Sequence, residues 1–187
     1  MRVEATNIEG LLIFTPDVFS DARGFFLESY NKERYLSIAS QLPDFVQTNL
    51  SKSTYGVIRG LHFQHPPYAQ AKLVSVISGK VLDVAVDLRP DSKTFGKHFS
   101  IELTGENHLQ LFIPKGFAHG FSVLSDEAVF EYKCSDYYNK DNEGGILWND
   151  PLLAIDWKLD HKDIIISPKD TCHPTFAEFV RRMKEER

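Results

Sequence analysis

Cysteine is scarce in this chain of 187 residues, which contains only Cys134 and Cys172. The two lie far apart in the sequence, and neither belongs to a CxxC motif or to a zinc-ligand pattern. We therefore expect two reduced thiols, and neither a disulfide nor a zinc site. The first ten residues lack the apolar segment of a signal peptide, and no apolar run approaches the length of a membrane span. The sequence thus predicts a soluble, cytoplasmic protein without a membrane partner.

Blocks of positive charge are also missing. The net charge is −5, from 21 Lys and Arg against 26 Asp and Glu, which argues against nucleic acid as a partner. There is no P-loop and no GxGxxG motif, so the common nucleotide-hydrolysing and dinucleotide-binding folds are excluded. The seven histidines include no HxH pair, and His62 and His65 would lie on opposite faces of a strand. We therefore expect no catalytic metal.

Apolar and aromatic residues are abundant and occur in strand-like runs. Hydrophobic residues make up 42% of the chain and aromatic residues 12%, with 14 phenylalanines, which indicates a folded core rich in rings. Between Gly56 and Lys133, short apolar segments alternate with turns, as is typical of an antiparallel β-sandwich or barrel. Because no linker and no internal repeat is found, we expect one all-β domain spanning residues 1–187.

The pattern of apolar residues places the individual elements. Strands are predicted at 11–14, 24–30, 45–50, 57–64, 70–77, 81–89, 97–103, 109–113, 121–124 and 128–134. Loops are predicted at 16–23, 51–56, 114–120 and 135–145. One helix is predicted at 31–41 with Asn31 as its N-cap, and another from about Pro174, followed by a charged tail. In the strand 81–89, Asp83 and Asp87 alternate with apolar residues, so they either face solvent or line the interior.

Three polar residues in predicted strands could carry out chemistry together. His62 can accept a proton from carbon near neutral pH, Lys72 can stabilise negative charge on a carbonyl oxygen, and Tyr132 can return a proton. Epimerisation beside a ketone requires this combination. Each residue also has a structural interpretation: a buried histidine in the core, a paired or strand-end lysine, and a core tyrosine. Strand alternation predicts that His62 shares a face with Ile58 and Gln64.

Arginines and tyrosines elsewhere in the sequence have side chains suited to a phosphate-bearing ligand. Arg23 and Glu28 form either a surface ion pair or ligand contacts, and the residue types alone do not decide. Arg23 and Arg59 carry guanidinium groups suited to phosphates, and Tyr137 and Tyr138 can stack on a base.

Several long motifs resemble those of the dTDP-4-dehydrorhamnose 3,5-epimerases, which are cupin (jelly-roll) enzymes. The motifs are DARGFFLESYN (21–31), FVQTNLSKS (45–53), GVIRGLHFQ (56–64), AKLVSVISGKVLDVAVDLRPDSKTFG (71–96), IPKGFAHGFSVLS (113–125), YKCSDYY (132–138) and EGGILWNDP (143–151). Together they cover nearly the whole chain. The resemblance implies a cupin-type jelly-roll sandwich with short peripheral helices.

The resemblance also implies roles for individual residues. His62 matches the family's general base, and Asp170 matches the carboxylate that orients it, with Asp83 as a second acidic candidate. Lys72 matches the residue that stabilises the enolate oxygen, and Tyr132 matches the opposing general acid. The residues that match ligand contacts are Arg23, Phe26, Glu28, Gln47, Asn49, Arg59, His119, Tyr138, Glu143 and Lys169.

The implied substrate is a dTDP-linked 4-keto-6-deoxy sugar, epimerised at the two carbons beside its ketone. The implied protein is a homodimer that needs neither a metal nor a redox cofactor, because the ketone itself accepts the electrons. Three alternatives stay open at this point: an epimerase acting at C3 or C5 alone, a metal-dependent cupin isomerase, and a cupin that binds sugars without catalysis.

Overall fold

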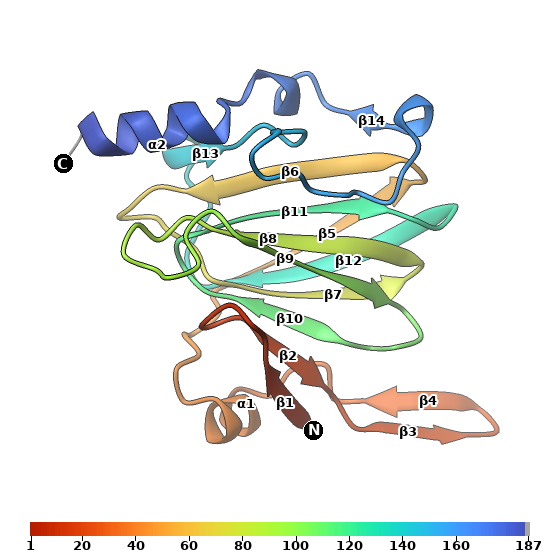
Figure 1. Ribbon diagram of the computed structural model, residues 1–187. Coiled ribbons are helices and arrows are strands. Elements are labelled where there is room, and N and C mark those ends of the chain that lie inside the picture. The colour runs from red at the N-terminus through yellow and green to blue at the C-terminus, as the bar shows by residue number, and fades with distance from the viewer. Residues whose placement is uncertain (186–187) are drawn as a thin grey trace.

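Two β-sheets face each other in the computed structural model, which describes residues 1–185 (Figure 1). The first sheet contains, in spatial order, β1 (Arg2–Ala5), β2 (Leu12–Thr15), β10 (Gln110–Ile113), β7 (Lys72–Ser78), β12 (Glu127–Cys134) and β5 (Gln47–Thr54). The second contains β13 (Glu143–Gly145), β6 (Val57–Gln64), β11 (Phe117–Val123), β8 (Lys80–Asp87) and β9 (His98–Thr104), with β14 (Ile165–Ile166) also paired to β6.

The remaining elements lie outside this sandwich. They are the hairpin of β3 (Val18–Asp21) and β4 (Gly24–Leu27), the α-helices α1 (Lys32–Ile38) and α2 (Phe176–Glu185), and the 3₁₀ helices η1 (Lys140–Asn142), η2 (His161–Asp163) and η3 (Asp170–Cys172). Figure 1 shows the β3–β4 hairpin extending away from the two sheets, at the end of the molecule opposite α2. No helix within residues 1–185 has the length and apolar character needed to cross a bilayer.

Alternation along β8 shows how the sequence builds two separate apolar layers. Val81 and Ala85 pack in the inner core, which draws residues from both sheets. Leu82 and Val84 point the other way, into an outer cluster covered by the C-terminal segment from Ile146 onward. Because both faces of β8 are covered, Asp83 is fully buried and lies on the inner face.

Some predicted strand boundaries are wrong, because burial and pairing with distant strands extend or create the strands. β11 begins at Phe117, inside the predicted loop 114–120, because a strand buried along its whole length shows no alternation. β5 continues to Thr54 through the polar run 51–54, which pairs with β12 along its full length. The predicted loops 16–23 and 135–145 contain the short strands β3 and β13.

The predicted helices are confirmed. Asn31 caps α1 as expected, and its side chain accepts a hydrogen bond of 3.1 Å from the backbone N–H of Arg34. The second helix, expected from about Pro174, begins at Phe176. The end of the predicted charged tail, residues 186–187, lies outside the described residues.

Candidate active site

A bulge in β6 turns two polar residues toward the first sheet. His62 pairs with His119 of β11, whereas Arg59 pairs with Phe121, so three steps along β6 match two along β11. The extra residue reverses the alternation, and Arg59 and His62 both face the first sheet. The prediction that His62 shares a face with Ile58 is therefore wrong, because Ile58 packs in the outer cluster.

Gly60 makes the bulge possible. Its φ is +133°, a region that favours glycine, and a Cβ at this position would lie 2.6 Å from the Cα of Gly120. A glycine inside a strand-like run is a known sign of a bulge, so the sequence held a signal that alternation alone missed.

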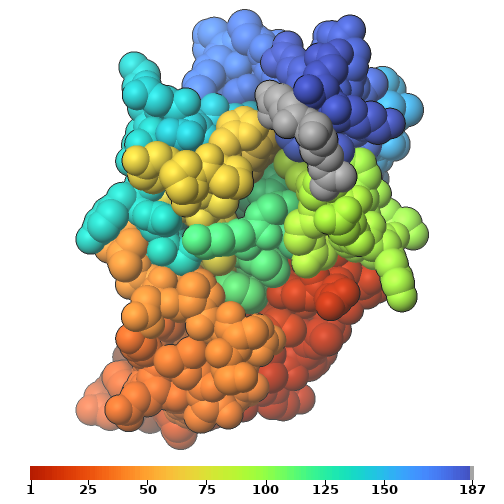
Figure 2. Space-filling view, turned by 90° about the vertical axis from the view of Figure 1, so that its left-hand side faces the viewer, coloured from red at the N-terminus to blue at the C-terminus, as the bar shows by residue number. Residues whose placement is uncertain are grey.

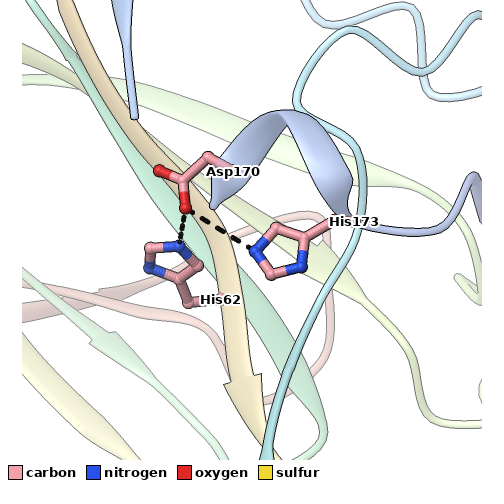
Figure 3. Close-up of side chains that lie close together, drawn as sticks. All are labelled: His62, Asp170 and His173. Atoms are coloured by element: carbon pink, nitrogen blue, oxygen red, sulfur yellow. Dashed lines mark hydrogen bonds and ion pairs between the residues drawn. The ribbon is translucent and has the colours of Figure 1, made fainter. Parts of the chain in front are cut away.

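His62 is held by a buried carboxylate from the C-terminal segment. Its Nε2 lies 2.7 Å from Oδ1 of Asp170, which is only 3% exposed, and the backbone N–H of Gly60 donates to Oδ2 at 3.4 Å (Figure 3). Burial opposes ionisation of Asp170, but its hydrogen bonds and the nearby His62 outweigh burial and leave its pKa below the usual value. With an ionised acceptor at Nε2, the imidazole carries its proton there and keeps the lone pair of Nδ1.

The three residues selected from separate strands do converge. His62 from the second sheet and Lys72 and Tyr132 from the first line one cavity of about 250 Å³. The ammonium of Lys72 lies 5.8 Å from the centre of the Tyr132 ring. The complete lining is Gln47, Asn49, His62, Phe63, Gln64, Gln70, Lys72, Tyr132, Tyr138 and Glu143.

Burial shifts the pKa values of Lys72 and Tyr132 in opposite directions. Desolvation lowers the pKa of Lys72, although Cys134, Asp83 and Glu143 partly restore it by attraction. Desolvation raises the pKa of Tyr132, and the nearby Cys134 adds to this. At neutral pH the phenol therefore keeps its proton and can act as an acid.

A second histidine–carboxylate pair lies behind the cavity. Nε2 of His119 is 2.8 Å from Oδ2 of Asp83, and both side chains are buried. Burial is the main cause of the lowered pKa of His119. His119 is absent from the cavity lining, so the structure places this predicted ligand contact next to the cavity wall and paired with the other acidic candidate, Asp83.

Half of the predicted ligand contacts gather at the mouth of the cavity. The Tyr138 hydroxyl donates to Oε2 of Glu143 at 2.9 Å, and the Lys169 ammonium lies 2.5 Å from the same oxygen. Gln47 donates to Asn49 at 2.9 Å and accepts from the Tyr138 backbone at 3.1 Å. Figure 2 looks onto this end of the sandwich, where the segment after β6 (yellow) lies beside the segment after β12 (cyan).

Arg59 lies outside this group and donates from Nε to Ser53 of the facing sheet at 3.0 Å. Three further predicted contacts lie on or beside the β3–β4 hairpin, away from the cavity lining. Arg23 is paired with Asp21, Phe26 is 70% exposed, and Glu28 accepts from Asn31 at 3.2 Å. The structure does not bring these three to the cavity of their own chain.

Sequence reasoning gave no role to three residues of the cavity lining and to one histidine behind the His62–Asp170 pair. Phe63, Gln64 and Gln70 line the cavity, and His173 lies edge-on to His62 with ring centres 5.6 Å apart. His173 follows Asp170 by three residues, and the 3₁₀ turn of η3 brings the two side chains close together. That spacing is the only sequence signal that could have indicated His173.

Fold and cavity together define the class of the protein. The facing antiparallel sheets form the cupin-type sandwich that the sequence predicts. Within it, a histidine–aspartate pair faces a lysine and a tyrosine across one cavity. The chain is thus a cupin-type protein with a pocket lined by titratable side chains.

Comparisons with known proteins narrow this class to one family. The family model for dTDP-4-dehydrorhamnose 3,5-epimerase matches residues 5–178. The dTDP-4-dehydrorhamnose 3,5-epimerase of Shigella flexneri is 52% identical over 178 residues, which cover 95% of this chain and 97% of the relative. The crystal structure of the corresponding enzyme from Elizabethkingia anophelis has a TM-score of 0.91 and 50% identity, and the match covers 95% of this chain and 97% of that one.

A second solved structure carries a ligand. It is the dTDP-6-deoxy-D-glucose-3,5-epimerase of Legionella pneumophila in complex with dTDP-4-keto-L-rhamnose, with a TM-score of 0.89 and 48% identity, covering 93% of this chain and 92% of that one. The chain belongs to the dTDP-4-dehydrorhamnose 3,5-epimerase family and is an epimerase, as the sequence motifs predict.

Proposed function

We propose that this chain converts dTDP-4-dehydro-6-deoxy-D-glucose into dTDP-4-dehydro-L-rhamnose by inverting C3 and C5. The observation that carries the proposal is the placement of His62 and Tyr132 on opposite sheets, across one cavity that also holds Lys72. Inversion needs a base on one side of the carbon and an acid on the other, and a cation near the oxygen between the two carbons.

The first step is removal of a proton from carbon. Nδ1 of His62 takes the proton, the C–H bond breaks, and the electron pair moves to the C4 carbonyl oxygen to give an enolate. Asp170 stabilises the imidazolium formed at His62, because it is ionised and buried against Nε2. The ammonium of Lys72 stabilises the negative oxygen, and its interaction is strengthened in a partly buried site.

The second step returns a proton from the other side. The Tyr132 hydroxyl donates to the same carbon from the first sheet, the enolate collapses to the ketone, and the carbon is inverted. His62 then loses its proton and the tyrosinate regains one from solvent. Since C3 and C5 both neighbour the C4 ketone, the same residues serve both carbons, and no redox cofactor is required.

Residues at the cavity mouth bind the nucleotide part of the substrate in this account. Tyr138 stacks on the thymine ring, and Gln47, Asn49, Glu143 and Lys169 surround it. Arg59 and His119 lie near the general base, His62, and contact the diphosphate and the sugar. The ligand bound to the Legionella relative supports a dTDP-sugar as the ligand of this chain.

The active unit is a homodimer in which the β3–β4 arm of one chain reaches the cavity of the other. The arm carries Phe19, Phe25 and Phe26 with more than half of each side chain exposed. Arg23, Phe26 and Glu28 then become ligand contacts of the partner's site. We also propose that residues 1–187 act as one domain, because the C-terminal segment supplies Asp170 and packs against the second sheet in the outer cluster.

Product analysis tests the proposed reaction. The chain is incubated with dTDP-4-dehydro-6-deoxy-D-glucose in D₂O with a chelator, and the sugar is examined by NMR. Incorporation of deuterium at C3 and C5 together with the L-rhamno configuration is expected. Incorporation at one carbon alone would identify a single-site epimerase, and incorporation at neither would overturn the proposal.

A further inference from the structure

His173 forms a three-residue cluster with the His62–Asp170 pair. Its Nε2 lies 3.6 Å from the same Asp170 oxygen that contacts His62, and the two imidazole rings meet edge to face at 73° (Figure 3). One potential ligand atom from each of the three side chains lies within 4.8 Å of the other two. Figure 3 shows the Asp170 carboxylate between the two rings.

The position of His173 is fixed by its surroundings. A Cβ at position 145 would lie 2.4–2.5 Å from the His173 ring, so the ring occupies space that only the glycine leaves free. Gly145 is in turn the strand partner of His62. The packing therefore holds His173 against the pair and leaves its side chain only 12% exposed.

Nε2 of His173 is buried and has no hydrogen-bond partner among the described residues. A buried polar nitrogen without a partner destabilises the folded chain, because it has lost its hydrogen bonds to water. Such groups in native structures call for an explanation, and an ion is one of the standard ones. Here the unpartnered nitrogen faces a carboxylate that already contacts a second imidazole.

We propose that His62, Asp170 and His173 form a binding site for one divalent transition-metal ion of the zinc type. Two imidazoles and one carboxylate are a common ligand set for Zn²⁺, with bonds of about 2.0–2.2 Å and a fourth position left open. Tetrahedral ligands at such bond lengths lie about 3.4 Å apart. The 3.6 Å between Asp170 and His173 already fits, and the 2.7 Å between His62 and Asp170 must open by less than 1 Å. The ligand nitrogens of the two imidazoles lie within 4.8 Å of each other and must close to the tetrahedral spacing.

Metal binding at this site switches off the base. A neutral imidazole that coordinates through Nε2 carries its proton on Nδ1, so His62 has no lone pair with which to take a proton from the substrate. The metal also replaces the hydrogen bond between His62 and Asp170. This inhibition rests on the proposed function, whereas the binding site itself does not.

Metal titration of the metal-free chain tests the site. Zn²⁺ is titrated calorimetrically and Co²⁺ by its visible absorption, for the wild type, His173→Phe and the matched control His161→Phe, which removes an exposed histidine of η2. The wild type and the control are expected to bind one ion per chain, and His173→Phe to bind at least about tenfold more weakly. Equal binding by wild type and His173→Phe, or no stoichiometric binding by either, would overturn the proposal.

Activity measurements separate this proposal from the proposed function. With chelator present, His173→Phe is expected to keep epimerase activity within about threefold of wild type and to unfold at the same or a higher temperature, since an unpartnered nitrogen is replaced by carbon. Added Zn²⁺ should inhibit the wild type and His161→Phe, but not His173→Phe. Loss of turnover in every chain, with the metal titration unchanged, would contradict the proposed function and leave the site standing.

Discussion

His62 and Tyr132 face the cavity from different sheets, and the proposed mechanism therefore gives the two proton transfers to different residues. Of these two residues, His62 has a buried carboxylate that can stabilise a positive charge, and Tyr132 has a pKa raised by desolvation. For single residues, burial and hydrogen-bond partners therefore favour His62 as the proposed base and Tyr132 as the proposed acid.

Replacing Tyr132 should uncouple exchange from inversion. In Tyr132→Phe, His62 can still remove the proton and return one to the same face, so deuterium enters the substrate with retention. Inversion is expected to fall by about 10²–10⁴-fold. NMR of the sugar in D₂O measures both, with Tyr137→Phe, an exposed tyrosine outside the cavity lining, as control. Equal loss of exchange and inversion would contradict separate roles.

The lowered pKa of Lys72 predicts an early alkaline limit to activity. Only the ammonium form stabilises the enolate, and desolvation lowers the pKa of Lys72. As the pH is raised, kcat should therefore begin to fall before the pH of about 10.4 at which an ordinary lysine loses its proton. Tyr132, with its raised pKa, loses its proton later. A pH–rate profile of Lys72→Arg, whose cation persists, should lose this limb. If Lys72→Arg keeps the same alkaline decline in kcat, that decline belongs to another titrating group.

At the scale of elements, the bulge in β6 is what turns His62 toward the cavity. Regular alternation would place it with Ile58 in the outer cluster, away from Lys72 and Tyr132. Two glycines on neighbouring strands, Gly60 and Gly120, allow the close approach that the bulge needs.

A methyl group at Gly60 should damage both stability and activity. Gly60→Ala places a Cβ 2.6 Å from the Cα of Gly120 and is expected to cost at least about 2 kcal/mol in the free energy of unfolding. Gly24→Ala is the matched control, because Gly24 has a similar φ of +127° but no atom within 4 Å of the added Cβ. Denaturant unfolding measures the two variants, and equal costs would show that close packing at the bulge is unimportant.

At the scale of the whole molecule, sequence patterns predicted the parts that depend on local periodicity. The alternation in 81–89 and the Asn31 cap are confirmed. Features set by residues far away in the sequence were not predicted. They are the reversed alternation at the β6 bulge, the start of β11 at Phe117, and the position of His173. Residue chemistry and the family motifs both selected His62, Lys72 and Tyr132, but only the folded sheets show that they share one cavity.

Mixing two inactive variants tests whether the arm completes the partner's site. His62→Ala lacks the base, and Phe26→Ala with Glu28→Gln alters the arm. In a mixed dimer, the cavity with intact His62 receives the intact arm of the other chain, so an equal mixture should recover about a quarter of wild-type activity. Unmixed samples serve as controls. Failure to recover activity, although mixed dimers form, would place the arm residues outside the site.

The most direct test of the central claim, that His62 is the base for both carbons, is solvent exchange by His62→Ala. Wild type and variant are incubated in D₂O with chelator and dTDP-4-dehydro-6-deoxy-D-glucose, and deuterium is followed at each carbon by NMR. The account predicts that exchange at C3 and C5 falls together by about 10²–10⁴-fold in the variant. Exchange at the wild-type rate at either carbon would contradict it.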